Sequence, residues 1–159
     1  MGRESGCHDV ALRLLAGRDL TTSQLRERLL RRELPADEIE RTLDRLTRGG
    51  LLDDARTALA LARRAVQIKL RGRHRARREL EALGIDPPVA ERALALVFAE
   101  VDEAAVLERA IAKRVRGPVG TRTELRRLHQ ALVRQGFARD EVAAALLARA
   151  GSDAALVEE

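Results

Sequence analysis

The sequence has 159 residues, which suits one compact domain or a short array of small ones. Its composition, 45% hydrophobic and 35% charged, argues against a membrane protein and against low-hydrophobicity disorder. The formal charge of +5 favours a polyanion or an acidic protein surface as the partner. Trp and Tyr are absent and the two phenylalanines, Phe98 and Phe137, are interpreted as core plugs, which argues against barrels and sheets that stack bases on aromatic rings.

The sequence offers no residues for catalysis or for holding a metal or cofactor. The single cysteine, Cys7, cannot form an intramolecular disulfide, and it lies beside His8 at what we expect to be a frayed end. No phosphate-binding glycine loop, paired-histidine metal motif or nucleophile elbow occurs. No apolar run is long enough for a signal or a membrane span. We therefore expect a cytoplasmic protein that is not an enzyme and does not contact a membrane.

Apolar residues recur three and four positions apart along nearly the whole chain, and no segment alternates with a period of two, so the pattern predicts an all-α protein. Glycines mark several helix ends. Thr21 with Gln24, and Thr121 with Glu124, have the spacing of a capping box, and Asp53 is interpreted as a helix N-cap. Helices are predicted over residues 7–17, 22–33, 37–48, 53–70, 73–83, 87–99, 101–116, 121–135 and 139–150.

The helical pattern repeats along the chain. When Leu34, Ile85 and Phe137 are aligned, at offsets of 51 and 52 residues, the apolar positions five and nine residues on either side coincide. A three-helix unit of this size has a marginal core, so neighbouring copies must stack. We expect three tandem three-helix repeats in an elongated, curved array, followed by a C-terminal tail. The predicted boundaries are 7–50, 51–100 and 101–150, with the tail at 151–159.

A first basic cluster, with no carboxylate inside it, occupies residues 63–78. Several of its arginines fall near the start of the helix expected at residue 73, where the helix dipole disfavours positive charge. Such a violation suggests function, because a bound polyanion would remove the repulsion. The alternative is a solvated face enriched in arginine by the codon usage of a GC-rich coding sequence. The cluster comprises Arg63, Arg64, Lys69, Arg71, Arg73, Arg75, Arg77 and Arg78.

A second basic cluster lies about one repeat further along the chain. Its members are Lys113, Arg114, Arg116, Arg122, Arg126, Arg127 and Arg134. If the repeats stack regularly, the two clusters could form one basic track suited to a nucleic-acid backbone. The predicted DNA- or filament-binding residues are the whole first cluster together with Arg122, Arg126 and Arg127. The arginines of the first repeat, Arg26, Arg28, Arg31 and Arg32, are instead interpreted as a solvated helix face, since acidic residues lie among them.

Four local motifs follow one another between residues 9 and 148. They are Ala11-Leu12-x-Leu14-Leu15-x-x-Arg18, Leu52-Asp53-Asp54-x-Arg56-x-Ala58, Gly72 through Glu79-Leu80-x-x-x-Gly84-Ile85, and Leu132-x-x-x-Gly136-Phe137. In order and spacing they resemble the RecX family, bacterial modulators of the RecA recombinase. The sequence departs from the family pattern at Leu20, Gln24, Glu33, Thr57 and Ala76.

The resemblance implies a negative regulator, without enzymatic activity, that acts in DNA repair, homologous recombination and the SOS response. Its expected partner is the RecA filament on single-stranded DNA, where it blocks extension and suppresses ATPase, co-protease and strand-exchange activities; we expect it to be a monomer. Duplex DNA bound without sequence preference is a further expected partner. Two alternatives stay open. The helices at 22–48 resemble a helix-turn-helix transcription factor, although tandem repetition argues against one. The second alternative is a protein-interaction scaffold that does not bind DNA.

Overall fold

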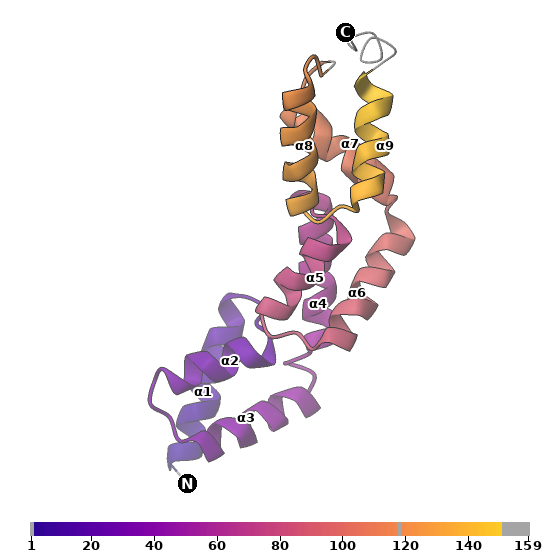
Figure 1. The fold of residues 1–159 in the computed structure, drawn as a ribbon. Coiled ribbons are helices and arrows are strands. Elements are labelled where there is room, and N and C mark those ends of the chain that lie inside the picture. Colours follow the sequence, from indigo (N-terminus) through magenta and orange to yellow (C-terminus); the bar gives the residue numbers. More distant parts are fainter. Residues whose placement is uncertain (1, 118, 151–159) are drawn as a thin grey trace. The chain divides into compact units, whose positions relative to one another are not determined.

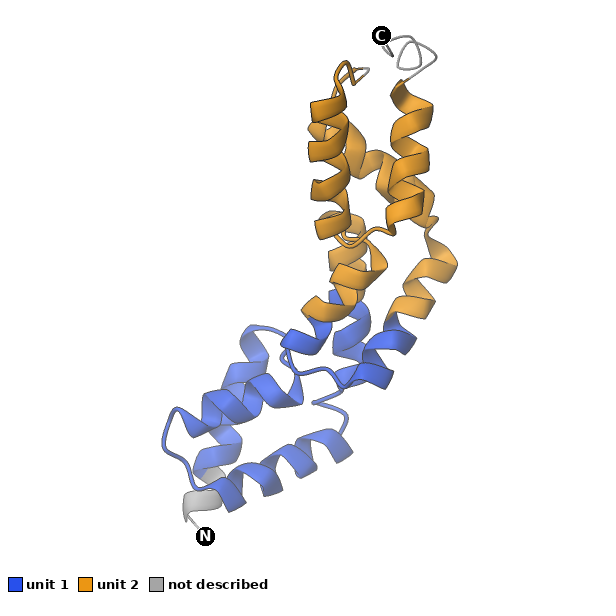
Figure 2. Ribbon diagram, viewed as in Figure 1, with its two compact units in different colours: residues 1–61, 80–93 blue, residues 62–79, 94–159 orange. Residues whose placement is uncertain are grey.

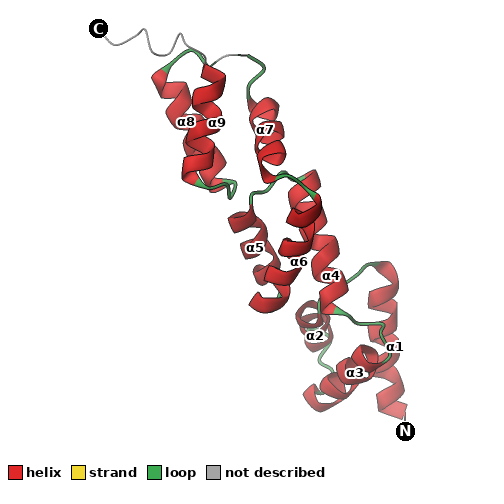
Figure 3. Cartoon of the chain, turned by 90° about the vertical axis from the view of Figure 1, so that its right-hand side faces the viewer, coloured by secondary structure: helices red, strands yellow, loops and turns green. Residues whose placement is uncertain are grey.

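The computed structural model describes residues 2–117 and 119–150 of the chain, and in these ranges it contains helices and no strand (Figure 1, Figure 3). The all-α prediction is therefore confirmed. The predicted tail at 151–159 lies outside the described residues. The helices are α1 (Gly2–Gly17), α2 (Thr22–Leu30), α3 (Ala36–Arg48), α4 (Asp54–Arg63), α5 (Arg73–Ala82), α6 (Pro87–Glu100), α7 (Glu103–Arg114), α8 (Arg122–Arg134) and α9 (Arg139–Ala150), with a π-helical turn, η1 (Arg64–Ile68), directly after α4.

Local sequence signals set most of these boundaries. Both predicted capping boxes form, at Thr21 and at Thr121. Asp53 Oδ1 accepts a hydrogen bond from Arg56 N at 3.0 Å, as expected of a cap at the start of α4. The expectation of a frayed end at Cys7 was wrong, because α1 begins at Gly2 and Cys7 is fully buried in the core.

The predicted helix at 53–70 is not regular throughout. It changes from α to π geometry at Arg64, and Leu70 then adopts a left-handed backbone with φ of 52°. A leucine rarely occupies this region, which costs an L-residue about 1–2 kcal/mol. The side chain of Leu70 is 5% exposed, so its burial offsets that cost.

The chain divides into two compact units, residues 1–61 with 80–93 and residues 62–79 with 94–159, here called unit 1 and unit 2 (Figure 2). Their limits fall within α4 and α6 and within the last turns of α5, so neither unit coincides with a predicted repeat. The boundaries at 7–50, 51–100 and 101–150 stay a prediction. For description, the helix groups α1–α3, α4–α6 and α7–α9 are called repeats 1, 2 and 3.

The apolar positions that align in the sequence are buried in all three repeats, apart from the half-buried Leu128. The offsets are counted from Leu34, Ile85 and Phe137. The positions five residues before these are Leu29, Leu80 and Leu132, the positions five after are Ile39, Ala90 and Val142, and the positions nine after are Leu43, Leu94 and Leu146. None of these nine side chains is more than 3% exposed. The turn itself recurs too, because Glu33, Gly84 and Gly136 all have positive φ, at 57°, 85° and 105°. The repeat is therefore a repeat of backbone conformation as well as of hydrophobic pattern.

The start of α2 packs against the turn between α5 and α6, inside unit 1. The Thr21 hydroxyl donates to the Leu83 carbonyl at 2.6 Å. A Cβ added to Gly84 would lie 2.2 Å from Ser23 Cβ, so only glycine fits. Repeat 1 thus contacts the turn of repeat 2 through the first residues of its second helix.

The same joint recurs in unit 2, one repeat further on. Gly72 N donates to the Gln135 carbonyl at 3.1 Å and His74 N to the Gly136 carbonyl at 3.2 Å. A Cβ on Gly72 would lie 2.4 Å from Gly136 C and O. The start of α5 therefore packs on the turn between α8 and α9 as the start of α2 packs on the turn between α5 and α6.

An acidic side chain from the following repeat caps each of these helix starts. Asp54 Oδ1 accepts from Thr22 N at 2.8 Å and from the Thr22 hydroxyl at 3.1 Å. Glu103 Oε1 accepts from Arg73 N at 3.3 Å. Thr22 and Arg73 are the first residues of α2 and α5, while Asp54 and Glu103 are the first residues of α4 and α7. A carboxylate at a helix N-terminus binds unpaired amides and complements the dipole.

Candidate nucleic-acid interface

Glu79 forms ion pairs with three members of the first basic cluster in unit 2. Its carboxylate lies 3.2 Å from Lys69 Nζ, 3.0 Å from Arg71 Nε and 3.2 Å from Arg75 Nε. Burial raises the pKa of Glu79, but the hydrogen bonds from Lys69 and Arg75 and the charge of Arg71 outweigh it, so that the pKa of Glu79 lies below its ordinary value. No carboxylate occurs within residues 63–78 of the sequence, but in the structure the Glu79 carboxylate lies next to three cations of the cluster.

Arg73 also has a partner and a fixed position. Its side chain lies 4.0 Å from the Glu103 carboxylate, and its guanidinium carbon lies 4.6 Å from the centroid of the half-buried Phe98 ring. Because Glu103 supplies negative charge at the start of α5, the expected violation of the dipole rule is relieved within the protein. Phe137 is a core plug as predicted, at 2% exposed, whereas Phe98 supports Arg73.

The remaining predicted residues are exposed and differ in their pairing. Arg63 lies 3.7 Å from Glu100, and Arg77 is exposed on α5. A further set is exposed and, within the described residues, takes part in none of the ion pairs: Arg64, Arg78, Arg122, Arg126 and Arg127. Because these side chains are exposed and form no ion pair within the described residues, they are available to a partner.

In repeat 1 the arginines behave as a solvated face with local pairs. Arg26 forms two contacts with Glu40, at 2.7 and 3.1 Å. This hydrogen-bonded pair raises the pKa of Arg26 and lowers that of Glu40. Arg31 pairs with Glu27 one helical turn away at 2.9 Å.

The two basic clusters meet in unit 2. A pocket of about 310 Å³ is lined by Lys69, Leu70 and Arg71 on one side, by Ala110, Lys113 and Arg114 of α7, and by Gln135. Arg114 Nη2 donates to Gln135 Oε1 at 2.6 Å, and Gln135 Nε2 donates to the Leu70 carbonyl at 2.6 Å. Gln135 thus joins α7 to the segment after η1. Stacking of repeats brings together cations that lie 44 residues apart in sequence.

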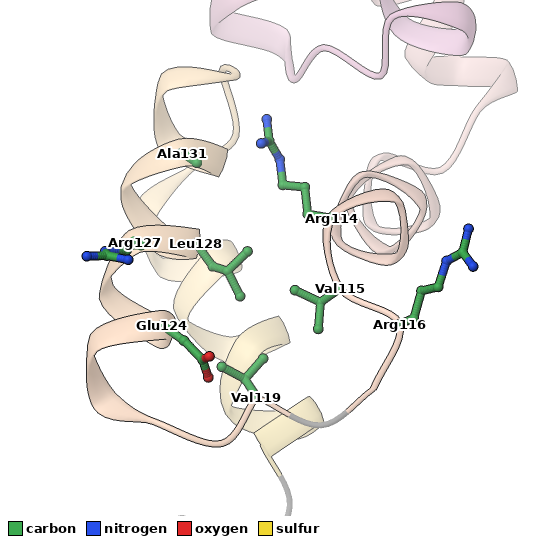
Figure 4. Close-up of a pocket in the computed structure, with 8 residues that line it drawn as sticks. All are labelled: Arg114, Val115, Arg116, Val119, Glu124, Arg127, Leu128 and Ala131. Carbon is green, nitrogen blue, oxygen red and sulfur yellow. The ribbon is translucent and has the colours of Figure 1, made fainter.

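A second hollow of about 560 Å³ lies between the end of α7 and α8, and its floor is apolar. Val115, Val119 and Leu128 point toward one another there, while Arg116 and Arg127 extend away from it on opposite sides (Figure 4). Glu124 at its edge belongs to the capping box of α8. The hollow is therefore less suited to an anion than the pocket that contains Lys69 and Lys113.

Sequence reasoning missed Gln135 and the carboxylates of Glu79, Glu100 and Glu103. Gln135, Glu100 and Glu103 contact residues from other helices or segments, so spacing along one helix carries no sign of their roles. Glu79 lies four residues after Arg75 on α5, a spacing that does indicate an ion pair. Lys113 and Arg114 were recognised as basic but not singled out. A signal was present, because Lys69 and Lys113 are the only lysines of the chain. In the part of the chain that the structure describes, no three potential metal ligands group together, and no helix has the length and apolarity to cross a membrane.

Two family models match the chain. The model described as RecX, first three-helix domain, matches residues 7–46, and that described as RecX, second three-helix domain, matches residues 53–94. The chain belongs to the RecX family. Regulatory protein RecX of Trichlorobacter lovleyi is 32% identical over 139 residues, covering 86% of this chain and 90% of the relative. Regulatory protein RecX of Thermotoga petrophila is 35% identical over 127 residues, covering 80% and 74%. The family gives this chain a regulatory role.

Solved structures of the RecX family share the fold. The crystal structure of RecX from Lactobacillus salivarius superposes with a TM-score of 0.76 at 22% identity, covering 93% of this chain and 96% of the other. A second structure, of regulatory protein RecX, gives a TM-score of 0.78 at 22% identity, covering 92% and 72%. The tandem three-helix architecture predicted from the repeated hydrophobic pattern is thereby confirmed.

Three of the four RecX motifs contribute residues to the joints between repeats. Asp54, of the Leu-Asp-Asp motif, caps α2. Gly84 and Gly136, from the third and fourth motifs, form the left-handed turns, and Gly72 packs on Gly136. At the corresponding turn of repeat 1, Glu33 adopts a left-handed φ of 57° where repeats 2 and 3 have glycine. Residues of these three motifs therefore make contacts by which neighbouring repeats stack.

Proposed function

We propose that this chain is a monomeric, cytoplasmic negative regulator of the RecA recombinase. It binds the RecA filament on single-stranded DNA, in the filament groove or at the growing end, and blocks filament extension. It thereby inhibits the ATPase, co-protease and strand-exchange activities of RecA in recombination, DNA repair and the SOS response. It performs no chemistry of its own and needs no cofactor. Membership of the RecX family supports the regulatory part of this proposal.

The observation that carries the DNA-binding part is the meeting of the two basic clusters in unit 2. Lys69 and Arg71 share a pocket with Lys113 and Arg114, and exposed arginines stand on α5 and α8. Such a surface attracts phosphate groups whatever the base sequence, because the attraction comes from charge and released counterions. With no Trp or Tyr in the chain, contacts with the sugar-phosphate backbone are favoured over base stacking.

The proposal is tested by titrating the protein into the cognate RecA on single-stranded DNA while ATP hydrolysis is followed. We expect the rate to fall at protein concentrations well below that of RecA, because blocking an end or a groove affects many RecA subunits. A hydrolysis rate that stays constant up to equimolar protein would overturn the proposed function.

The contribution of the basic surface is tested with a triple substitution of exposed arginines, Arg78→Glu, Arg126→Glu and Arg127→Glu. These residues are preferred to Arg73 and Arg75, which hold carboxylates of the fold. We expect inhibition to weaken about tenfold or more, since three favourable charges become repulsive. The matched control, Arg45→Glu, Arg48→Glu and Arg92→Glu, changes the net charge equally at exposed positions of unit 1. Equal inhibition by both triple variants, with helical circular dichroism in each, would remove these arginines from the interface.

The alternatives give different results in the same materials. A helix-turn-helix transcription factor would bind one duplex sequence far more tightly than others at moderate salt. A pure scaffold would show no DNA binding even at low salt. The proposed regulator binds single strands without sequence preference and inhibits RecA.

A further inference from the structure

Both lysines of the chain line the same pocket. The protein contains 30 lysines and arginines, and only Lys69 and Lys113 are lysine. They come from different repeats, one after η1 and the other near the end of α7, and both border the pocket of about 310 Å³ in unit 2. Codon usage that enriches arginine does not explain why lysine is kept at two positions that meet in space.

The walls of this pocket are held in place by a hydrogen-bonded chain. Gln135 is 8% exposed and bridges the Arg114 guanidinium to the Leu70 carbonyl, with both contacts at 2.6 Å. The left-handed φ of Leu70 turns the backbone so that its neighbours, Lys69 and Arg71, both border the cavity. Backbone strain that the surroundings hold in place often marks a functional site.

Positive charge exceeds negative charge around the pocket. Four cations line it, and no carboxylate does. Glu79 lies within ion-pair distance of two of them, Lys69 and Arg71, and also pairs with Arg75. Arg71 Nε is buried and makes no hydrogen bond of good geometry, although Glu79 Oε1 is 3.0 Å away. Within the described residues Lys113 takes part in no ion pair that the structure contains.

We propose that this pocket binds one phosphate group, a phosphodiester of the single-stranded DNA backbone. The proposal rests on the proposed function and extends it to residues outside the candidate set, namely Lys113, Arg114 and Gln135. Ammonium groups bind phosphate as point charges, and a guanidinium binds two of its oxygens at once. Only Leu70 and Ala110 are apolar in the lining, so the pocket suits the charged backbone better than the aliphatic side chain of an acidic peptide.

The test measures binding of a fluorescently labelled oligothymidylate to the full chain by anisotropy over a series of NaCl concentrations. The variant is Lys69→Gln with Lys113→Gln, and the matched control is Arg45→Gln with Arg48→Gln on α3, which removes the same charge. We expect the double lysine variant to bind several-fold more weakly. Because one phosphate is then no longer neutralised, the slope of log K against log salt should become shallower by about 0.7. The control is expected to keep the wild-type slope.

A second variant separates charge from structure. Lys69→Arg with Lys113→Arg keeps both positive charges and is expected to bind the oligonucleotide within about twofold of wild type. If the arginine pair binds as weakly as the glutamine pair while both stay helical, the lysines act on packing and the phosphate proposal is overturned. If the glutamine pair keeps wild-type affinity and salt slope, the proposal is likewise overturned.

The source of the phosphate is tested with inorganic phosphate alone. At matched ionic strength, replacing chloride by phosphate is expected to change the thermal midpoints of wild type and the glutamine pair equally. A midpoint increase confined to wild type, together with an unchanged oligonucleotide slope in the variant, would assign the pocket to free phosphate and overturn the phosphodiester assignment.

Failure of this proposal is distinct from failure of the proposed function. If the glutamine pair inhibits the RecA ATPase and binds the oligonucleotide as wild type does, regulation of RecA stands and the pocket assignment fails. If wild type leaves the RecA ATPase unchanged while the glutamine pair binds DNA more weakly than wild type, the pocket assignment stands without the proposed function.

Discussion

Replacing Gly72 by alanine tests the joint that positions the basic surface. The added Cβ would lie 2.4 Å from Gly136 C and O and 2.5 Å from Phe137 N. All three are backbone atoms, so no side-chain rotation relieves the overlap. The start of α5 and the turn between α8 and α9 must move apart by about 1 Å to restore ordinary contact.

The cost can be worked from the hydrogen bonds that this movement stretches. Those from Gly72 N to Gln135 O and from His74 N to Gly136 O are 3.1 and 3.2 Å long, and both would lengthen to about 4 Å, too long for a hydrogen bond. Each contributes about 1 kcal/mol, and overpacking adds about 1–3 kcal/mol. We expect Gly72→Ala to lower the free energy of unfolding by about 3–5 kcal/mol, a large part of the roughly 5–15 kcal/mol of a typical domain.

Thermal unfolding followed by circular dichroism measures this effect. For a chain of this size the midpoint should fall by about 6–20 °C. Gly17→Ala is the matched control, because a Cβ at Gly17 would meet nothing within 4 Å, and its midpoint should change by about 2 °C or less. Midpoints that fall equally little in the two variants would refute the close approach of Gly72 and Gly136.

Three further predictions concern local features of the same fold. Asp54→Ala removes two hydrogen bonds to Thr22 and should lower the free energy of unfolding in urea by about 1–2 kcal/mol, whereas Asp54→Asn, which keeps an acceptor, should lose less; equal losses would contradict the cap. Glu33→Gly should stabilise by about 0.5–1 kcal/mol in the same assay, since the left-handed backbone costs glutamate more than glycine loses in entropy; destabilisation would contradict this. Because the folded pKa of Glu79 is lowered from its ordinary value, its ion pairs stabilise the protein above the unfolded pKa, and this stabilisation is lost as pH falls through the folded pKa. Urea unfolding at pH 7 and pH 3 should therefore show Glu79→Gln about 1–2 kcal/mol less stable than wild type at pH 7 and a smaller deficit at pH 3, and a difference independent of pH would contradict it.

The fold was predictable because its signals are local or strictly periodic. Leu29, Leu80 and Leu132 recur at fixed offsets and are all buried. The capping box at Thr21 needs only a residue three positions away. Such information lies within one helix or in the comparison of one repeat with the next, and a single sequence contains both.

Contacts between helices could not be predicted from sequence spacing in this way. Glu103 lies 30 residues from Arg73, and no spacing rule connects them before the repeats are stacked. Glu79 pairs with Arg75 one turn away on α5, which spacing indicates, but its contacts with Lys69 and Arg71 cross the irregular backbone between η1 and α5. The first cluster therefore contains residues of two kinds, some that stabilise the fold and some that are available to bind a partner.

The arginine content of the chain cannot by itself decide between DNA binding and codon usage. Arg71, Arg73 and Arg75 pair with carboxylates of the fold, so an arginine in the cluster is no sign of an external ligand. Lysine is informative here because it is rare: Lys69 and Lys113 occupy one pocket although they lie in different repeats. The choice of residue, more than the amount of positive charge, singles out this pocket within the basic surface.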